Sequence, residues 1–387
     1  MNELERLIKD YINKNGPITF EQYMEEALYH PSLGYYTSGK QRVGPEGDFY
    51  TAPYASSVMS MIIAKQIAQF FELLGKPDPF YVVEFGAGTG RMADDIIESL
   101  ITWHKDVYER VNYIIVETGS NFDIEHKEKI KVFKTPSVIK PFTGCIISNE
   151  LFDALPVHII VMKDRLYEVY VDVKDDQFVE VLEPASDATL AHIDNLGIEL
   201  TQDVRTEINL RAGKMLETMA SILMHGYVLT IDYGYNTLDY YSPDRTNGTL
   251  MCYYKHQADD NPYELSGEKD LTSHVDFTNL AKKGLELSLE PIGYVRQMDF
   301  IYALGYEKLL KNLKEVINDP VDYFRLTSAS KFLIMPGTMG EIFKVMLQYK
   351  GGKGLPVPSG FTYKNMVTLL FKQHQPPLRK EGGHGPT

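Results

Sequence analysis

The chain has 387 residues, of which 44% are hydrophobic and 24% are charged, and this indicates a globular protein of two or three structural units. Its net charge of −14 disfavours a nucleic-acid partner, because an acidic surface repels phosphate. The two cysteines, Cys145 and Cys252, exclude a disulfide framework and a cysteine-based zinc site, so we expect two buried thiols and no metal.

The N-terminal part is expected to consist of helices and loops. Short helices are predicted over 2–14 and 19–29, followed by an ordered loop over 30–56 that is rich in Gly, Pro and Tyr. A longer helix is predicted over 57–74, where polar residues such as Lys65 interrupt the apolar run. This pattern favours a buried amphipathic helix over a membrane span.

Strands and helices alternate in the following part of the chain. Short apolar runs separated by helical segments are typical of a buried, mostly parallel sheet. Strands are predicted over 80–85, 111–117, 144–149, 226–232, 285–294 and 342–350, and helices over 91–104 and 203–224.

Two polar stretches interrupt this alternation. Residues 159–182 alternate apolar and polar positions, which predicts an antiparallel hairpin turning at Lys163, Asp164 and Arg165. Residues 233–275 are rich in turn formers, and ordered excursions of this length often carry function. We expect such insertions to build a second lobe.

The sequence VVEFGAGTGR, from Val82 to Arg91, places three glycines between a predicted strand and a predicted helix. Such a turn exposes backbone N–H groups and lets a polar ligand approach closely. A phosphate-binding loop would need Gly-Lys-Ser/Thr, and the dinucleotide fingerprint would need glycine where Arg91 stands. The alternative is a tight turn without a ligand.

Two acidic residues favour a ligand other than a nucleotide phosphate. Glu84 precedes Gly86, Gly88 and Gly90, at a position where an acid is unfavourable for pyrophosphate and suits a cationic ligand. Glu117 ends the next predicted strand, where an acid can hold ribose hydroxyls. This is the pattern of class I methyltransferases, whose cofactor is S-adenosyl-L-methionine (SAM).

Further motifs occur in order along almost the whole chain. They are GDFYTAP (47–53), YIIVETGSN (113–121), SNELFDALPVH (148–158), LTIDYGY (229–235), NGTLMCYYKH (247–256), DLTSHVDFTNL (270–280) and MGEIFKVM (339–346). Together with the glycine turn they resemble the MidA family of SAM-dependent methyltransferases, and SNELFDALPVH and SHVDF are specific to that family.

The resemblance implies a fold, an activity and a partner. The fold is α/β, a class I SAM-methyltransferase Rossmann-like sheet with an N-terminal helical extension and a second lobe from insertions. The activity is that of a protein arginine N-methyltransferase acting on a protein acceptor, such as a respiratory complex I-type subunit. The chain departs from the family pattern at Tyr54 and at Gln297-Met298-Asp299, and both changes bear on the acceptor.

The resemblance also suggests how the chain is divided. We expect an extension over 1–75, the first part of the SAM-binding core over 76–158, a hairpin insertion over 159–202, a core helix and strand over 203–232, an acceptor-side insertion over 233–283, C-terminal core elements over 284–350 and a tail over 351–387.

Methylation of arginine requires acidic side chains, because a guanidinium stays protonated in water and is a poor nucleophile. Carboxylates that grip the guanidinium localise its charge and leave one nitrogen free to attack. Asn149, Glu150 and Asp153 follow a predicted strand, at the edge where open α/β sheets bind ligands, and are candidate catalytic residues. The alternative is a helix cap with solvated acids.

Four other polar residues are candidates for the site. His274, in SHVDF, is a candidate catalytic residue, although a lone histidine is more often structural. Asp48 and Thr51, in GDFYTAP, are candidate cofactor contacts from a lid. Asp232 ends a later strand and either faces the same cleft or accepts hydrogen bonds from loop amides.

Two other functions stay open on this evidence. The acceptor is either a protein arginine or, alternatively, a small molecule or another protein side chain. A weakly catalytic SAM-binding assembly factor is the second alternative, and the intact Glu84, Glu117 and Glu150 argue against it. No targeting segment is seen at the N-terminus, so we expect a bacterial-type cytoplasmic protein.

Overall fold

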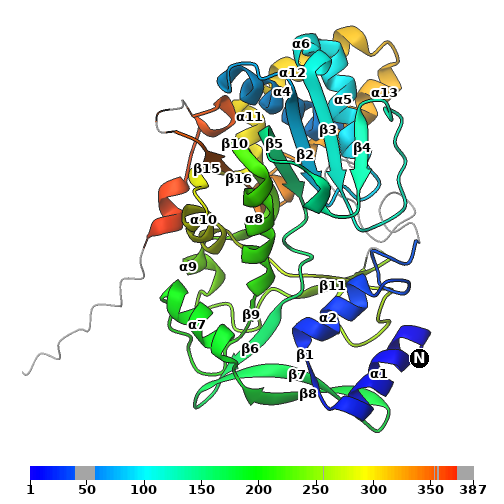
Figure 1. Cartoon of the computed structure of the whole chain (residues 1–387), viewed down its shortest axis with the longest axis vertical. Coiled ribbons are helices and arrows are strands. Elements are labelled where there is room, and N and C mark those ends of the chain that lie inside the picture. Colours follow the sequence, from blue (N-terminus) through cyan, green and yellow to red (C-terminus); the bar gives the residue numbers. More distant parts are fainter. Residues whose placement is uncertain (40–56, 256, 353, 355–356, 373–387) are drawn as a thin grey trace, which may run out of the picture.

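The computed structural model describes residues 1–39, 57–255, 257–352, 354 and 357–372. Within these residues the strands form three sheets, and the chain folds into two lobes, shown one above the other in Figure 1. The largest sheet lies in the upper lobe, and the N-terminus and the first helix lie in the lower one.

The largest sheet has the strand order β15-β16-β10-β5-β2-β3-β4, with a further short strand, β14, on β10. Its strands are β2 (Phe80–Phe85), β3 (Val111–Val116), β4 (Ile130–Phe133), β5 (Phe142–Asn149), β10 (Leu223–Tyr235), β14 (Val275–Asp276), β15 (Glu290–Arg296) and β16 (Phe343–Lys350). Strands β4, β3, β2, β5 and β10 are parallel, whereas β16 is antiparallel to β10 and to β15. The carboxyl ends of the parallel strands therefore meet at one edge, where such sheets bind ligands.

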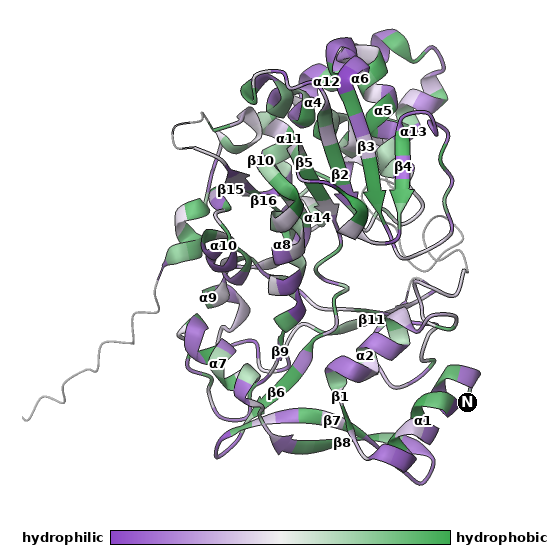
Figure 2. Cartoon of the chain, in the orientation of Figure 1, coloured by the Kyte–Doolittle hydropathy of each residue, from purple (hydrophilic) through white to green (hydrophobic). Residues whose placement is uncertain are grey.

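Helices cover both faces of this sheet, because its parallel strands bury apolar residues on both sides. Figure 2 shows that β5 consists mostly of hydrophobic residues. One face packs against α4 (Ser57–Leu73), α5 (Arg91–Trp103), α6 (Lys105–Arg110), α11 (Gln297–Ala303), α12 (Tyr306–Val316), α13 (Pro320–Lys331) and α14 (Met339–Ile342). The other face packs against α8 (Leu210–Ile222) and α10 (Phe277–Glu286). Val82 and Val83 illustrate the alternation, because these neighbours in β2 belong to opposite cores.

The lower lobe has a core of its own. It contains α1 (Glu3–Asn15), α2 (Phe20–Tyr29), α7 (Asp187–Leu196), α9 (Thr237–Tyr240), β1 (Ile18–Thr19), β6 (His158–Met162), β7 (Leu166–Lys174), β8 (Gln177–Pro184), β9 (Arg205–Ile208), β11 (Met251–Tyr254), β12 (Gln257–Asp259) and β13 (Asp270–Thr272). Strands β1, β7, β6 and β9 form one antiparallel sheet with β8 on β7, and β12, β11 and β13 form the other. Phe20, Val169 and Leu271 join α2 to both sheets in one apolar cluster.

The two predicted N-terminal helices are confirmed as α1 and α2. Each begins with a reciprocal pair of hydrogen bonds between its capping side chain and the residue three positions later. Asn2 pairs in this way with Glu5, and Thr19 with Gln22. These bonds satisfy backbone amides that the helix itself leaves free, which explains why the helices start there.

The hairpin predicted over 159–182 is also confirmed, because β6 and β7 pair across a turn at residues 163–165. The helix predicted over 203–224 is wrong at its start. There the chain forms β9, which pairs with β6, and α8 begins only after Asn209, whose side chain accepts a hydrogen bond from the amide of Ala212. Pairing with a neighbouring strand outweighs the local helical pattern.

Two expectations near the C-terminus also need correction. The strand predicted over 285–294 starts later, because α10 continues to Glu286 and β15 begins at Glu290. The segment after residue 350 is more than a tail, since Phe361 and Leu370 are buried in the two cores of the upper lobe. Among the described helices, none combines the length and the apolar character needed to cross a membrane.

Candidate active site

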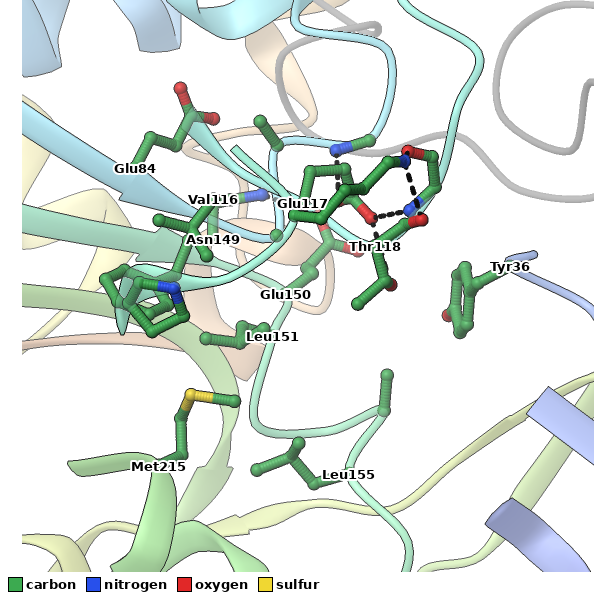
Figure 3. A pocket seen from close by; sticks show the side chains of 18 of the residues that line it. Tyr36, Glu84, Val116, Glu117, Thr118, Asn149, Glu150, Leu151, Leu155 and Met215 are labelled. Carbon is green, nitrogen blue, oxygen red and sulfur yellow. Dashed lines mark hydrogen bonds between the residues drawn. The ribbon is translucent and has the colours of Figure 1, made fainter. Parts of the chain in front are cut away.

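A cavity of about 740 Å³ opens at the carboxyl edge of the large sheet, between this edge and the lower lobe (Figure 3). The turn after β2, the segments after β3 and β4, and the loop after β5 supply one part of its lining. Met215 and Ile222 of α8 supply an apolar part, together with Leu151 and Leu155. Tyr29, Tyr36 and Asp270 approach from the lower lobe. The volume is typical of a small-molecule site.

The glycine turn after β2 depends on backbone angles that other residues adopt only with strain. Gly86, Gly88 and Gly90 have φ angles of 72°, 57° and 85°. A Cβ on Gly90 would lie 2.7 Å from Ile124 Cγ1, whereas a Cβ on Gly88 would meet no described atom within 4 Å. Glycine is therefore required at Gly90 by packing, and at Gly88 it leaves space next to the cavity.

Glu117, at the end of β3, holds the glycine turn in place. Its Oε2 accepts a hydrogen bond from the amide of Gly88 at 3.0 Å, and its Oε1 accepts one from the amide of Gly119 at 2.6 Å. The first of these bonds joins two segments that are separated by 29 residues. The acid at the end of one strand thus fixes the loop at the end of its neighbour.

Glu84, in β2, is almost completely buried and lines the inner end of the cavity. The hydroxyl of Tyr113 donates a hydrogen bond to Glu84 Oε2 at 2.7 Å. Burial raises the pKa of Glu84 to about 7, although the Tyr113 bond acts in the opposite direction. The carboxyl group is thus poised between its neutral and ionised forms near neutral pH.

The end of β5 and the loop after it carry the three polar residues that the sequence singled out, Asn149, Glu150 and Asp153, and all three line the cavity. The side-chain amide of Asn149 donates to Glu150 Oε1 at 3.1 Å. Glu150 has a φ of 53°, and its amide donates to the carbonyl of Ile231 at 3.0 Å. Burial raises the pKa of Asp153 to about 6. The loop therefore presents two carboxylates from a strained but hydrogen-bonded backbone.

Asp232 lies behind this loop and not among the described residues that line the cavity. Its Oδ2 accepts hydrogen bonds from the amides of Phe152 at 3.0 Å and of Asp153 at 3.4 Å, and its Oδ1 accepts one from Tyr233 at 2.9 Å. Burial, followed by the charges of Asp153 and Glu150, raises its pKa well above the usual range. Of its two expected roles, the structure supports the binding of loop amides.

The structure does not bring His274 into the lining of this cavity, as far as the described residues show. Its ring lies 5.2 Å from that of Tyr233 and 5.1 Å from that of Tyr235. Burial, with the charges of Arg245 and Lys344, lowers its pKa to about 4. Asp48 and Thr51, expected to contact the cofactor, lie outside the described residues.

Tyr29, Tyr36 and Asp270 line the cavity although the sequence did not single them out. Tyr29 ends α2, Tyr36 lies in the following loop, and Asp270 begins β13. The only signal for Tyr36 was the abundance of tyrosine in residues 30–56, and Tyr29 lies just before that stretch, at the end of a predicted helix. Nothing in the local sequence relates them to Asp270, which lies more than 230 positions away.

Comparison with known proteins relates most of the chain to methyltransferases. The family model described as "Putative S-adenosyl-L-methionine-dependent methyltransferase" matches residues 62–295. The human protein arginine methyltransferase NDUFAF7, mitochondrial, is 28% identical over 86% of this chain and 80% of its own length. The Caenorhabditis elegans homolog of that protein is 26% identical over 95% of this chain and 92% of its own length.

A solved structure gives the same relation. A protein from Burkholderia thailandensis, crystallised with bound S-adenosyl-homocysteine, matches this chain with a TM-score of 0.83 and 28% identity. The match covers 95% of this chain and 96% of that one.

The human and nematode relatives are named mitochondrial, which contradicts the cytoplasmic localisation expected from the sequence. A low cysteine count favours any reducing compartment and does not single out the cytosol.

Proposed function

This chain belongs to the family of putative S-adenosyl-L-methionine-dependent methyltransferases, and on that premise we propose that it methylates an arginine of a protein acceptor. The observation that carries the proposal is the meeting of two sites in one cavity. The glycine turn and Glu117 lie on one side of it, and Glu150 and Asp153 lie beside them on the loop after β5. The names of the human and nematode relatives support arginine as the acceptor.

The cofactor end of the cavity fits SAM in two respects. The space beside Gly88 is open to a ligand that approaches the backbone closely, as a glycine cradle requires. Glu117 accepts hydrogen bonds from two backbone amides and from the Thr118 hydroxyl, and it retains acceptor capacity for a ribose hydroxyl, because a carboxylate has about four acceptor sites. We assign Gly86, Gly88 and Gly90 to the approach of the methionine part.

Glu84 orders the cationic end of the cofactor in this proposal. Its buried carboxyl group lies at the inner end of the cavity, and a positive charge nearby favours its ionised form. Bound SAM supplies the reactive methyl group on a positively charged sulfur, so the protein needs to supply position and charge complementarity.

The acceptor end uses the loop after β5. Glu150 and Asp153 grip the guanidinium through charge-assisted hydrogen bonds, and Asn149 orients Glu150 through the bond between their side chains. The nitrogen that takes the methyl group loses a proton. Asp153 is suited to accept it, because a base with a pKa of about 6 is largely ionised at neutral pH and still binds a proton readily.

Transfer of a radioactive methyl group from SAM into the proteins of a lysate tests this function. Hydrolysis of the labelled protein is expected to yield methylated arginine. Glu150→Gln and Asp153→Asn are each expected to slow this transfer by about 100-fold or more, as is usual for the loss of a catalytic carboxylate, while binding of S-adenosyl-homocysteine persists.

A matched control is Asp164→Asn, which removes an exposed carboxylate at the turn between β6 and β7 and should leave the transfer unchanged. Label in lysine, in a small molecule or in no product at all would refute arginine as the acceptor. Calorimetric binding of S-adenosyl-homocysteine to the same preparations separates a wrong acceptor from a lost cofactor site.

A further inference from the structure

One part of the cavity lining does not come from the large sheet. Tyr29 and Tyr36 reach it from α2 and the loop that follows, and Asp270 reaches it from β13. Figure 3 shows the ring of Tyr36 across the cavity from Asn149 and Leu151. The lower lobe therefore contributes aromatic and acidic groups directly to the candidate active site.

These groups are fixed in position by contacts with one another. The Tyr36 hydroxyl donates a hydrogen bond to Asp270 Oδ1 at 2.7 Å, and the Tyr29 hydroxyl donates one to the carbonyl of Ala154 at 3.1 Å. The two rings stack, with centroids 5.5 Å apart and an angle of 26° between their planes. Tyr35, which is buried, supports Tyr36 edge-on at 5.0 Å. A site held this way costs little entropy to organise on binding.

Acidic groups surround the stacked pair. Burial, and then the charge of Asp270, raise the pKa values of the Tyr29 and Tyr36 hydroxyls well above the usual range. Glu117 adds to the effect on Tyr29, and Asp153 adds to the effect on both. Burial, and then the charges of Asp270, Asp153 and Glu150, raise the pKa of Tyr253, which pairs with Asp270 between β11 and β13. These directions agree with the cavity lining, which contains carboxylates from both lobes.

We propose that Tyr36, stacked on Tyr29 and hydrogen-bonded to Asp270, forms the subsite that receives the planar cation of the acceptor arginine and selects it over other side chains. This subsite rests on the proposed function, because it shares one cavity with Glu150 and Asp153, which are proposed to act on the acceptor arginine. An aromatic face attracts a cation through its quadrupole, and the planar guanidinium can also stack parallel to the ring. The chain itself contains such a pair, with Arg245 Cζ 4.2 Å from the centre of the Tyr235 ring.

The subsite explains why the lower lobe is needed for selection. Glu150 and Asp153 alone would bind either an ammonium or a guanidinium, because both carry one positive charge. A rigid ring in the same cavity as these carboxylates favours the flat, weakly hydrated group. The tyrosine pair therefore acts as a specificity determinant, and the carboxylates of the loop after β5 act on the reacting group.

Binding of short peptides to the protein saturated with S-adenosyl-homocysteine tests the subsite without requiring turnover. The probes are acetyl-Gly-Gly-Arg-Gly-Gly-amide and the same peptide with citrulline or lysine in place of arginine. We expect the arginine peptide to bind about tenfold or more tightly than the citrulline peptide, which has the same shape and no charge, and more tightly than the lysine peptide.

Variants distinguish recognition from packing between the lobes. Tyr36→Leu keeps an apolar side chain but removes the aromatic face, and Tyr36→Phe keeps the face but loses the hydroxyl. We expect Tyr36→Leu and Asp270→Asn to weaken arginine-peptide binding several-fold, which corresponds to the loss of about one cation–π contact. Tyr36→Phe is expected to retain most of the wild-type affinity. Binding of S-adenosyl-homocysteine is the control that each variant is folded, and Tyr11→Ala on the exposed side of α1 is the matched surface control.

Three outcomes would overturn the subsite. They are equal binding of arginine and citrulline peptides, no binding of either, or a Tyr36→Leu variant that binds like the wild type. Failure of the proposed function is a separate result. If the wild type binds the arginine peptide selectively but transfers no methyl group to arginine, the subsite stands and the proposed reaction is refuted. If Tyr36→Leu and Asp270→Asn both methylate arginine as the wild type does, the proposed reaction stands and the subsite is refuted.

Discussion

The carboxylate of Glu117 accepts a hydrogen bond from the backbone amide of Gly88, with 3.0 Å between Oε2 and the nitrogen. The bond ties the end of β3 to the turn after β2, at the point where the cavity meets the carboxyl edge of the sheet. Its strength depends on the charge of the carboxylate, because hydrogen bonds to ionised groups are roughly twice as strong as neutral ones.

Glu117→Ala is expected to weaken binding of S-adenosyl-homocysteine by about 10- to 100-fold, since it removes charge-assisted bonds worth about 1.5–3 kcal/mol from the turn. Glu117→Gln should have an intermediate effect, because its amide oxygen still accepts one hydrogen bond. Titration calorimetry measures both changes. Glu109→Ala, an exposed residue of α6, is the control, and equal affinities for the control and Glu117→Ala would argue against a cofactor role.

The glycines of the turn should respond differently to alanine. Gly90→Ala places a Cβ 2.7 Å from Ile124 Cγ1, so we expect it to lower the free energy of unfolding by about 1–3 kcal/mol through overpacking, besides the strain of a positive φ. Gly88→Ala meets no described atom within 4 Å, so its cost to stability is smaller, about 1–2 kcal/mol of backbone strain.

The expected difference between these two variants lies in cofactor binding. The methyl group of Gly88→Ala occupies the open space beside the cavity, so this variant should lose affinity for S-adenosyl-homocysteine out of proportion to its loss of stability. Thermal unfolding and calorimetry of both proteins give the comparison. A Gly88→Ala variant with wild-type affinity would show that the space is not part of the binding site.

Glu84 is expected to make the stability of the free protein depend on pH. The unfolded chain loses this proton near the ordinary value of 4.5, whereas the folded protein keeps it up to about 7. The free energy of unfolding should therefore fall as pH rises across that window, by about 3 kcal/mol from this group alone. Denaturant unfolding of wild type and Glu84→Gln at pH 5 and pH 7.5 measures the effect.

The Glu84→Gln variant should lose this contribution to the pH dependence and be more stable than wild type at pH 7.5. It should also bind S-adenosyl-homocysteine less tightly there, because it lacks the charge that attracts a cationic group. Parallel pH profiles of stability for the two proteins would mean that Glu84 does not titrate in this window.

Asp232→Asn is expected to loosen the loop that carries Glu150 and Asp153. The carboxylate accepts hydrogen bonds from the amides of Phe152, Asp153 and Tyr233, and an asparagine amide would turn a donor toward some of them. We expect a loss of about 1–3 kcal/mol in the free energy of unfolding, the cost of leaving buried amides without an acceptor. Methyl transfer should fall further than S-adenosyl-homocysteine binding, and equal losses of both would contradict a role confined to this loop.

The sequence was sufficient for the core of the fold. Continuous apolar runs predicted the parallel strands β2, β3, β5 and β10, because a strand buried on both faces has no polar alternation. It was also sufficient for the identity of the family. The glycine spacing, Glu84 and Glu117 predicted SAM, and the matching family model agrees with the resemblance to SAM-dependent methyltransferases.

Other features were decided by packing between distant segments. Residues 205–208 have a helical local pattern but pair with β6, and a neighbouring strand can override local preference. Asp232 supports the loop after β5 and does not line the cavity, and His274 packs among tyrosines outside it, as far as the described residues show. The motifs that contain Asp232 and His274 indicated that both residues lie near the site. They did not indicate whether either side chain lines the cavity.

The sequence by itself determined the features that depend on residues a few positions apart. These features are the strand periods, the capped helices, the glycine turn and the acids that end two strands. The tertiary structure alone decided which acids share a cavity and that Tyr36 meets Asp270 there. The physical reason is that a period or a cap is set within one turn or one strand, whereas a contact across more than 230 residues exists only once both lobes have folded against each other.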